Sequence, residues 1–294
     1  MNRQVPFGGI WTEQKLQILS GYLREYRKIF QRNPNARFYE VTYLDAFAGT
    51  GRIPRKKDSP FVGLLPELEM ADEEFRSGSV RRALEINPPF HRYVFIEKHG
   101  GKYQELDALA KEFPDRNIEV VNSDANDALL RWCQNLNRAK QRAVVFMDPF
   151  GTCVRWETIE TLANTKAIDL WILFPCATIN RMLPSKRKPP KAWSERLTSV
   201  FGTSEWETQF YGTDSYESLL HAGSTVNRIR KLADHRSITE FFLDRMRTRF
   251  TKVSRPGYLC HTRGPLFALI FAAGNEKGAG PGLRIAEHLL RKLD

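Results

Sequence analysis

The chain has 294 residues, enough for one large domain or two small ones without stabilisation by disulfides. Hydrophobic residues make up 41% and charged residues 27%, which excludes a disordered tail protein, a collagen and a coiled coil. The 45 Lys and Arg against 34 Asp and Glu give a net charge of +11, which fits a polyanionic partner such as nucleic acid but does not by itself establish one.

The sequence shows no targeting or metal-binding signal. The longest apolar runs, 143–147 and 266–273, are shorter than the roughly 20 residues of a membrane span. Residues 1–9 lack the apolar stretch and cleavage site of a secretory signal, so we expect a cytoplasmic protein with no membrane contact. The cysteines and histidines do not cluster, so neither a disulfide framework nor a metal site is expected. The four cysteines are Cys133, Cys153, Cys176 and Cys260.

Strands and helices are predicted to alternate over residues 1–175. The expected strands are 38–47, 93–97, 118–122, 143–147 and 168–174. The expected helices are 12–31, with Thr12 as N-cap, 79–86, with Ser79 as cap, 102–113, 125–137 and 157–164. This alternation predicts an α/β, Rossmann-like doubly wound sheet that is mostly parallel. The polar residues 52–77 are expected to leave the core as an excursion.

Residues 176–236 break the alternation and predict an inserted, mostly helical lobe that is basic and rich in aromatic residues. Ser237 and Glu240 then form an expected capping box for a helix that completes the core with residues up to 294. Two strands, near 251–261 and 266–273, and a closing helix near 283–293 follow. The chain is therefore expected to have a core in two parts, 1–175 and 237–294, with the lobe between them.

Acidic residues follow four successive predicted strands, at Asp45, Glu97, Asp124 and Asp148. The carboxyl ends of parallel strands form the ligand-binding edge of such a sheet, so these acids are expected to lie along one crevice. We expect Glu97 to bind both ribose hydroxyls of an adenosyl ligand and Asp124 to accept from its adenine amino group. The segment that begins at Asp45 also supplies Phe47, Ala48, Gly49 and Gly51, whose Gly-x-Gly lets the backbone approach the ligand.

The segment Asp148, Pro149 and Phe150 is the candidate acceptor site. Asp148 and a nearby carbonyl are expected to accept hydrogen bonds from an exocyclic amine, which localises its lone pair toward a methyl donor. Phe150 is expected to stack on a flipped base. A second chemistry remains open, in which a Cys176 thiolate attacks a pyrimidine ring, although a buried structural cysteine is the commoner case.

These motifs resemble the class I S-adenosylmethionine methyltransferases, especially those that act on nucleic-acid amino groups. More closely, and over nearly the whole chain, the sequence resembles the family called three-Cys-motif partner protein. The resemblance implies S-adenosylmethionine as cofactor and a separate partner protein with a three-cysteine motif, in a bacterial or phage-related system. The matching features are Trp11-Thr12-x-x-Lys15-Leu16, Tyr22, Tyr26, 45–51, 95–97, 148–151, Trp156, Asp169-x-Trp171, Phe174-Pro175 and 265–267.

The sequence departs from the pattern of typical relatives in two places. Glu97 lies 52 residues after Asp45, where the ribose-binding acid usually follows the glycines by about 20 residues. A single proline, Pro149, separates Asp148 from Phe150, where amino-methylating enzymes usually have two. A catalytically silent methyltransferase-fold module that binds nucleic acid or a partner protein is therefore the alternative. A dinucleotide-dependent oxidoreductase is disfavoured because G-x-G-x-x-G is absent.

Basic residues beside aromatic ones predict the nucleic-acid contacts. The candidates are Lys186, Arg187, Lys188 and Lys191, with Arg52, Arg55, Lys56 and Lys57 as a further rim of the cleft. Residues 221–256 contain nine Lys or Arg against three acids, and we interpret Arg245, Arg247 and Arg249 mainly as the solvated side of a helix. Trp156 and Trp171 are expected to belong to the core.

Overall fold

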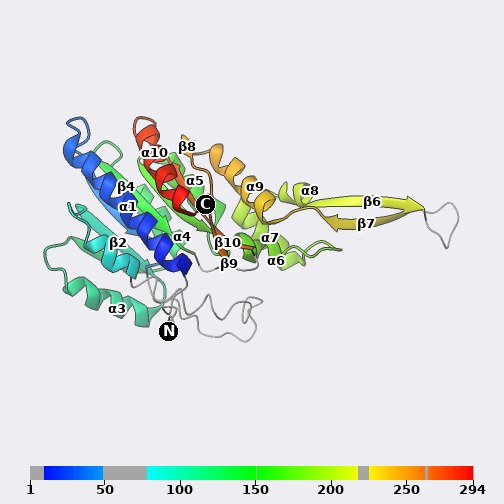
Figure 1. Ribbon diagram of the computed structural model, residues 1–294. Helices are drawn as coiled ribbons and strands as arrows, with labels where there is room; N and C mark the ends of the chain where they lie inside the picture. Colours follow the sequence, from blue (N-terminus) through cyan, green and yellow to red (C-terminus); the bar gives the residue numbers. More distant parts are fainter. Residues whose placement is uncertain (1–9, 49–77, 150, 218–224, 262–263, 294) are drawn as a thin grey trace, which may run out of the picture.

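We describe the protein from a computed structural model, over residues 10–48, 78–149, 151–217, 225–261 and 264–293. The excursion 52–77 expected from the sequence lies outside this described part. The described chain forms a central sheet in the order β3-β2-β1-β4-β5-β10-β8, with β9 paired to β10, and a separate two-stranded hairpin (Figure 1). Strands β1 to β5 are mutually parallel, whereas β10 runs antiparallel to β5.

The sheet strands are β1 (Glu40–Asp45), β2 (Arg92–Glu97), β3 (Ile118–Asn122), β4 (Gln141–Met147), β5 (Ile168–Phe174), β8 (Lys252–Val253), β9 (Gly257–His261) and β10 (Gly264–Ala273). The helices are α1 (Ile10–Arg32), α3 (Gly100–Lys111), α4 (Ala125–Gln134), α5 (Trp156–Asn164), α6 (Cys176–Arg181), α7 (Lys191–Phe201), α8 (Trp206–Phe210), α9 (His235–Arg247) and α10 (Ala279–Leu290), with a 3-10 turn at Arg291–Leu293 and a helical segment at 78–84. The doubly wound α/β prediction is confirmed.

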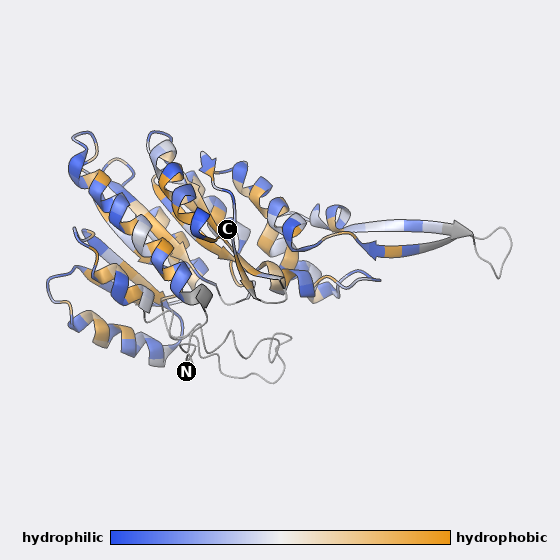
Figure 2. Ribbon diagram, in the orientation of Figure 1, coloured by the Kyte–Doolittle hydropathy of each residue, from blue (hydrophilic) through white to orange (hydrophobic). Residues whose placement is uncertain are grey.

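Each face of the sheet carries its own hydrophobic core. On one face, Tyr43 and Phe95 pack beneath α1, segment 78–84, α3 and α10. On the other, Leu44 and Val94 pack beneath α4, while α5, α7 and α9 cover β4 and β5. Side chains of a strand alternate between the two faces, so these buried runs of apolar residues fill both cores (Figure 2). Among the described helices, none combines the length and the hydropathy of a transmembrane segment.

Three predicted caps differ from the structure. Thr12 lies inside α1, which already includes Ile10. Ser79 lies inside the helical segment 78–84, and its hydroxyl donates to Asp45 instead of capping the helix. Helix α9 begins two residues before Ser237, because Asp234 is the N-cap and accepts from the Ser237 amide, while the Ser237 hydroxyl accepts from the Asp234 amide. The capping box is therefore present, but Ser237 is its third helical residue and Glu240 is not part of it.

The lobe between β5 and α9 contains the short helices α6, α7 and α8 and then an antiparallel hairpin that the sequence analysis did not predict. Its strands are β6 (Tyr211–Glu217) and β7 (Thr225–Lys231). The hairpin projects away from the body of the protein, and most of it is polar or weakly hydrophobic (Figures 1 and 2). Tyr211 is buried at its base, and Leu232, just beyond β7, lies against Gly212.

Candidate functional site

The predicted acids lie along the carboxyl edge of the sheet. Asp45 at the end of β1 pairs in register with Phe95 of β2 and with Phe146 of β4, so Glu97 and Asp148 each lie two residues beyond the end of the ladder with β1. Glu97 pairs in register with Asn122 of β3, two residues before Asp124. Across strands β3, β2, β1 and β4 the order is therefore Asp124, Glu97, Asp45, Asp148. At about 4.8 Å per strand the row spans roughly 14 Å, enough for an extended adenosyl ligand.

Asp45 organises the turn that follows β1. Its carboxylate is buried and accepts from the Phe47 amide over 3.1 Å and from the Ser79 hydroxyl over 3.1 Å. The Ala48 amide donates to the Ile96 carbonyl on the neighbouring strand over 3.0 Å. Asp45 therefore shapes the backbone that leads into the predicted glycine turn, whose Gly49 and Gly51 lie outside the described residues.

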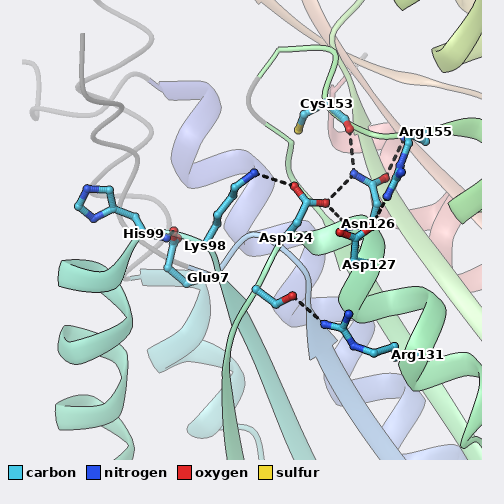
Figure 3. A network of polar contacts seen from close by, with 10 residues as sticks. Glu97, Lys98, His99, Asp124, Asn126, Asp127, Arg131, Cys153 and Arg155 are labelled. Atoms are coloured by element: carbon cyan, nitrogen blue, oxygen red, sulfur yellow. Dashed lines mark hydrogen bonds and ion pairs between the residues drawn. The ribbon is translucent and has the colours of Figure 1, made fainter. Parts of the chain in front are cut away.

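Glu97 and Asp124 each make polar contacts at the ends of β2 and β3 (Figure 3). Glu97 Oε1 accepts from the His99 amide over 2.6 Å at the start of α3, and its second oxygen has no partner among the described residues. Asp124 caps α4 by accepting from the Asn126 amide, and its other oxygen accepts from Lys98 over 3.1 Å. Burial raises the pKa of Asp124, but hydrogen bonds from Lys98 and Asn126 outweigh it, so the net pKa is lowered.

Asn126 is a functional candidate that the sequence reasoning missed. Its amide nitrogen donates to Asp124 and to the Cys153 carbonyl over 3.0 Å, and its Oδ1 accepts from the Arg155 amide and the Thr158 hydroxyl. One buried side chain thus ties the acid after β3 to the loop after β4 (Figure 3). The signal was an amide side chain in the first turn of the helix predicted at 125–137, next to the candidate acid Asp124, where burial requires hydrogen-bond partners.

Asp148 contacts a lysine that the sequence reasoning did not assign to the site. Lys15 Nζ lies 2.7 Å from Asp148 Oδ2, and the two side chains are 0% and 3% exposed. Lys15 comes from the first turns of α1, on the same stripe as Leu19, Tyr22 and Tyr26, all buried. A lysine at this spacing within an apolar stripe indicates a buried charge with a partner, and this pattern was the available signal.

The remaining acceptor candidates are placed only in part. Pro149 lines a narrow apolar slot of about 10 Å³ together with Phe174 and Phe242, whereas Phe150 lies outside the described residues. Cys176 is buried, with its thiol 3.4 Å from the Leu266 carbonyl. Burial raises the pKa of Cys176 to about 12, so the thiol is protonated at neutral pH. The thiolate chemistry left open by the sequence is therefore disfavoured.

The basic candidates separate into paired and unpaired residues. Lys188 contacts Glu207 over 2.8 Å and Lys191 lies 3.8 Å from Glu195, while Lys186 and Arg187 are exposed without an ion pair to any described residue. The arginines predicted to form the solvated side of the helix contact other residues of the protein: Arg247 is exposed, Arg245 is half-buried over Trp156, and Arg249 lies beyond the end of α9. Arg245 donates to the Phe201 carbonyl, Arg247 contacts Glu240 and Asp244, and Arg249 contacts Glu160. Trp156 and Trp171 are buried, as predicted.

No protein-family model matches the chain, and no curated protein matches it. Among solved structures, a Legionella pneumophila protein of the family DUF519 is similar at 13% identity, covering 99% of this chain and 94% of that one with a TM-score of 0.47. A putative methyltransferase from Escherichia coli has 17% identity, coverages of 71% and 84% and a TM-score of 0.27. The N-terminal domain of EvdMO1 with SAH bound has 10% identity, coverages of 86% and 80% and a TM-score of 0.35. The fold assignment rests on the strand order and directions described above, and the three-Cys-motif partner family stays a prediction.

Proposed function

We propose that the protein is an S-adenosylmethionine-dependent methyltransferase that acts on an amino group of nucleic acid. The observation that carries the proposal is the row of Asp124, Glu97, Asp45 and Asp148 along one edge of the parallel sheet. In open α/β sheets this carboxyl edge is where ligands bind. The order of the acids matches the order of groups in an adenosyl ligand, with adenine at β3, ribose at β2 and the reacting end toward β4.

The donor chemistry of the residues present fits this cofactor. Glu97 has a carboxylate oxygen with no partner among the described residues, which suits the vicinal hydroxyls of a ribose. Asp124 is an acceptor held in place by Lys98 and Asn126 at the adenine end of the row. When bound, the cofactor supplies an activated methyl group on a sulfonium. The protein contributes binding, orientation and the placement of charge.

Asp148 and Lys15 define the acceptor side of the site. Lys15 fixes the Asp148 carboxylate at the end of β4 and balances its charge in a buried position. In the proposed reaction Asp148 holds the loop that presents Pro149 and Phe150, and it accepts from the target amine through its carboxylate. An acceptor at this place orients the amine lone pair toward the methyl group.

The buried ion pair also favours the second candidate function, a methyltransferase-fold module without catalysis. The Asp148 carboxylate contacts Lys15, and Asp148 is only 2% exposed. An incoming amine therefore has poor access to this carboxylate. In this alternative the protein binds nucleic acid or the proposed three-Cys-motif partner, and Asp148 serves only the fold. Methyl transfer from bound cofactor separates the two functions.

Calorimetry with S-adenosylmethionine and S-adenosylhomocysteine tests the cofactor site. We expect wild-type protein to bind both, and Glu97→Gln and Asp124→Asn each to weaken binding by about tenfold or more, because each removes a charge-assisted hydrogen bond. Glu119→Gln is the matched control, since Glu119 lies on β3 but pairs with Arg92 away from the carboxyl edge. Absence of binding by folded wild-type protein, or equal losses in the control, contradicts the proposal.

Transfer of a labelled methyl group to DNA and RNA then tests the reaction. Label found in an exocyclic amine of either polymer supports the methyltransferase, with Asp148→Asn expected to lower the rate at least about a hundredfold. Cofactor binding without label transfer, with and without a three-Cys-motif protein added, supports the silent module instead.

A further inference from the structure

A groove of about 760 Å³ lies where the hairpin joins the lobe. Its lining comes from the end of α6, the residues before α7, Asp214 of β6, and β7 with the start of α9. The side chains used below are Asn180, Lys186, Arg228, Arg230, Lys231 and His235. The sequence analysis selected Lys186 alone among these as a nucleic-acid contact, because it did not predict the hairpin that brings Arg228 and Arg230 to the groove.

Positive charge dominates this groove. Lys186 and Arg228 are exposed and form no ion pair with any described residue, whereas Arg230 contacts Asp214 over 3.1 Å. Lys231 is held at the floor, where it donates to the carbonyl and the side-chain oxygen of Asn180 over 2.7 Å and 2.6 Å. Burial is the main cause that lowers the pKa of His235, and the charges of Lys231 and Arg181 lower it further against the opposing effect of Asp234.

Helix α6 connects the groove to the edge of the sheet that holds the proposed acceptor site. Helix α6 begins directly after β5, the strand next to β4, and Asn180 is its fifth residue. At 1.5 Å per helical residue, Asn180 lies roughly 6 Å along the helix axis from Cys176, so α6 connects the end of β5 to the groove. Asp148 ends the neighbouring strand at the same edge of the sheet.

We propose that this groove binds backbone phosphates of the nucleic-acid strand on one side of the target nucleotide. Arg228 and Lys186 are the phosphate ligands, and Lys231, fixed by Asn180, adds charge from the floor. The inference rests on the proposed function, because it places the groove next to a nucleic-acid acceptor site. It adds a contact surface that does not involve the cofactor-binding acids.

Fluorescence anisotropy of labelled single-stranded DNA and RNA, measured over a salt series, tests the groove. The double variant Lys186→Gln with Arg228→Gln removes two charges without breaking an ion pair to a described residue, so it leaves the fold intact. We expect affinity to fall at least about tenfold and the slope of log K against log salt to become less steep by about 1.4, the value for two phosphates on a single strand.

The matched control is the double variant Lys277→Gln with Arg284→Gln, which changes the net charge by the same amount. Lys277 lies just before α10 and Arg284 lies on it, and α10 covers the opposite face of the sheet. Loss in the groove variant with near wild-type affinity in the control supports the proposal. Equal losses in both double variants, no loss in either, or no binding of any oligonucleotide by wild-type protein overturns it. Cofactor calorimetry on the same samples shows separately whether the adenosyl site, and with it the methyltransferase proposal, fails.

Discussion

The Tyr22 hydroxyl of α1 donates a hydrogen bond to Asp169 Oδ2 of β5 over 2.7 Å, inside the core between α1 and α10. Tyr22 also packs edge-on against Trp171, with ring centroids 5.2 Å apart. This acid lies near the amino end of β5, away from the carboxyl edge, so it belongs to the packing of α1 on the sheet. Its burial nevertheless has a measurable consequence for stability.

Asp169 should make the protein less stable as pH rises from about 4 to about 7. Burial raises its pKa to about 7 in the folded protein, against the lowering effects of Tyr22 and Arg142, whereas an unfolded Asp titrates near 3.9. Between these values the folded state holds one more proton than the unfolded state, so the free energy of unfolding falls with pH by up to about 1.4 kcal/mol per unit. The effect is complete above the folded pKa.

Asp169→Asn should remove this fall while keeping an acceptor for Tyr22. Denaturant unfolding of both proteins from about pH 4 to about pH 8 isolates the contribution, since all other groups are shared. The free energy of unfolding of the variant minus that of the wild type is expected to increase as the pH rises from about 4 to about 7. A constant difference across the window would show that Asp169 does not titrate there.

The Lys15 and Asp148 ion pair should show strong energetic coupling. Lys15→Met removes the cation next to a buried carboxylate and is expected to cost about 3–5 kcal/mol of unfolding free energy. The double variant Lys15→Met with Asp148→Asn removes both charges and should recover a large part of that loss. A double-mutant cycle from denaturant unfolding measures the coupling, and additive single losses would contradict a direct interaction.

The sequence predicts some elements to the residue and others not at all. Strands β3 and β5 have the predicted bounds, because their branched and apolar runs stop sharply at polar or turn residues. The hairpin β6–β7 was missed because its strands are polar and pair only with each other, which leaves no periodic apolar pattern to detect. Helix periodicity located α9 but placed its start at Ser237, since Asp234 and Ser237 are both good capping residues.

Candidate site residues were found where a local rule applies and missed where the partner is distant. Acids at strand ends are visible in the sequence once the strands are assigned, and this rule located Asp45, Glu97, Asp124 and Asp148. Lys15 and Asp148 are 133 residues apart, and nothing local indicates that they meet. Arg228 joins Lys186 only through the hairpin, so the groove follows from tertiary structure.

Cysteine reactivity should follow burial. Cys260 is exposed, whereas burial raises the pKa of Cys133 and of Cys176 to about 12 in each case. A disulfide reagent at neutral pH should modify Cys260 first and leave Cys176 unmodified until the protein unfolds. In a Cys260→Ser background, rapid modification of Cys176 in folded protein, located by peptide mass analysis, would revive the thiolate chemistry.

Gly202 is the C-cap of α7, and its backbone conformation and surroundings favour glycine over any other residue. It has φ +67°, and a Cβ atom there would lie 2.0 Å from Trp156 Cδ1. Trp156 cannot yield easily, because it packs edge-on against Phe242 and beneath Arg245. Gly202→Ala should therefore cost left-handed strain of about 1–2 kcal/mol and, in addition, the displacement of a buried Trp, for a total of roughly 3 kcal/mol or more.

A substitution at Gly151 is the control that measures the left-handed strain without the displacement of a Trp side chain. Gly151 has φ +60°, close to that of Gly202, but no atom of the described residues beyond its chain neighbours lies within 4 Å of an added Cβ. Gly151→Ala should therefore lose only the strain, about 1–2 kcal/mol, in the same denaturant assay. If the two variants are equally destabilised, the strain alone accounts for Gly202 and Trp156 moves without cost. A larger loss at Gly202 by about 1 kcal/mol or more shows that the end of α7 is held against a rigid Trp156.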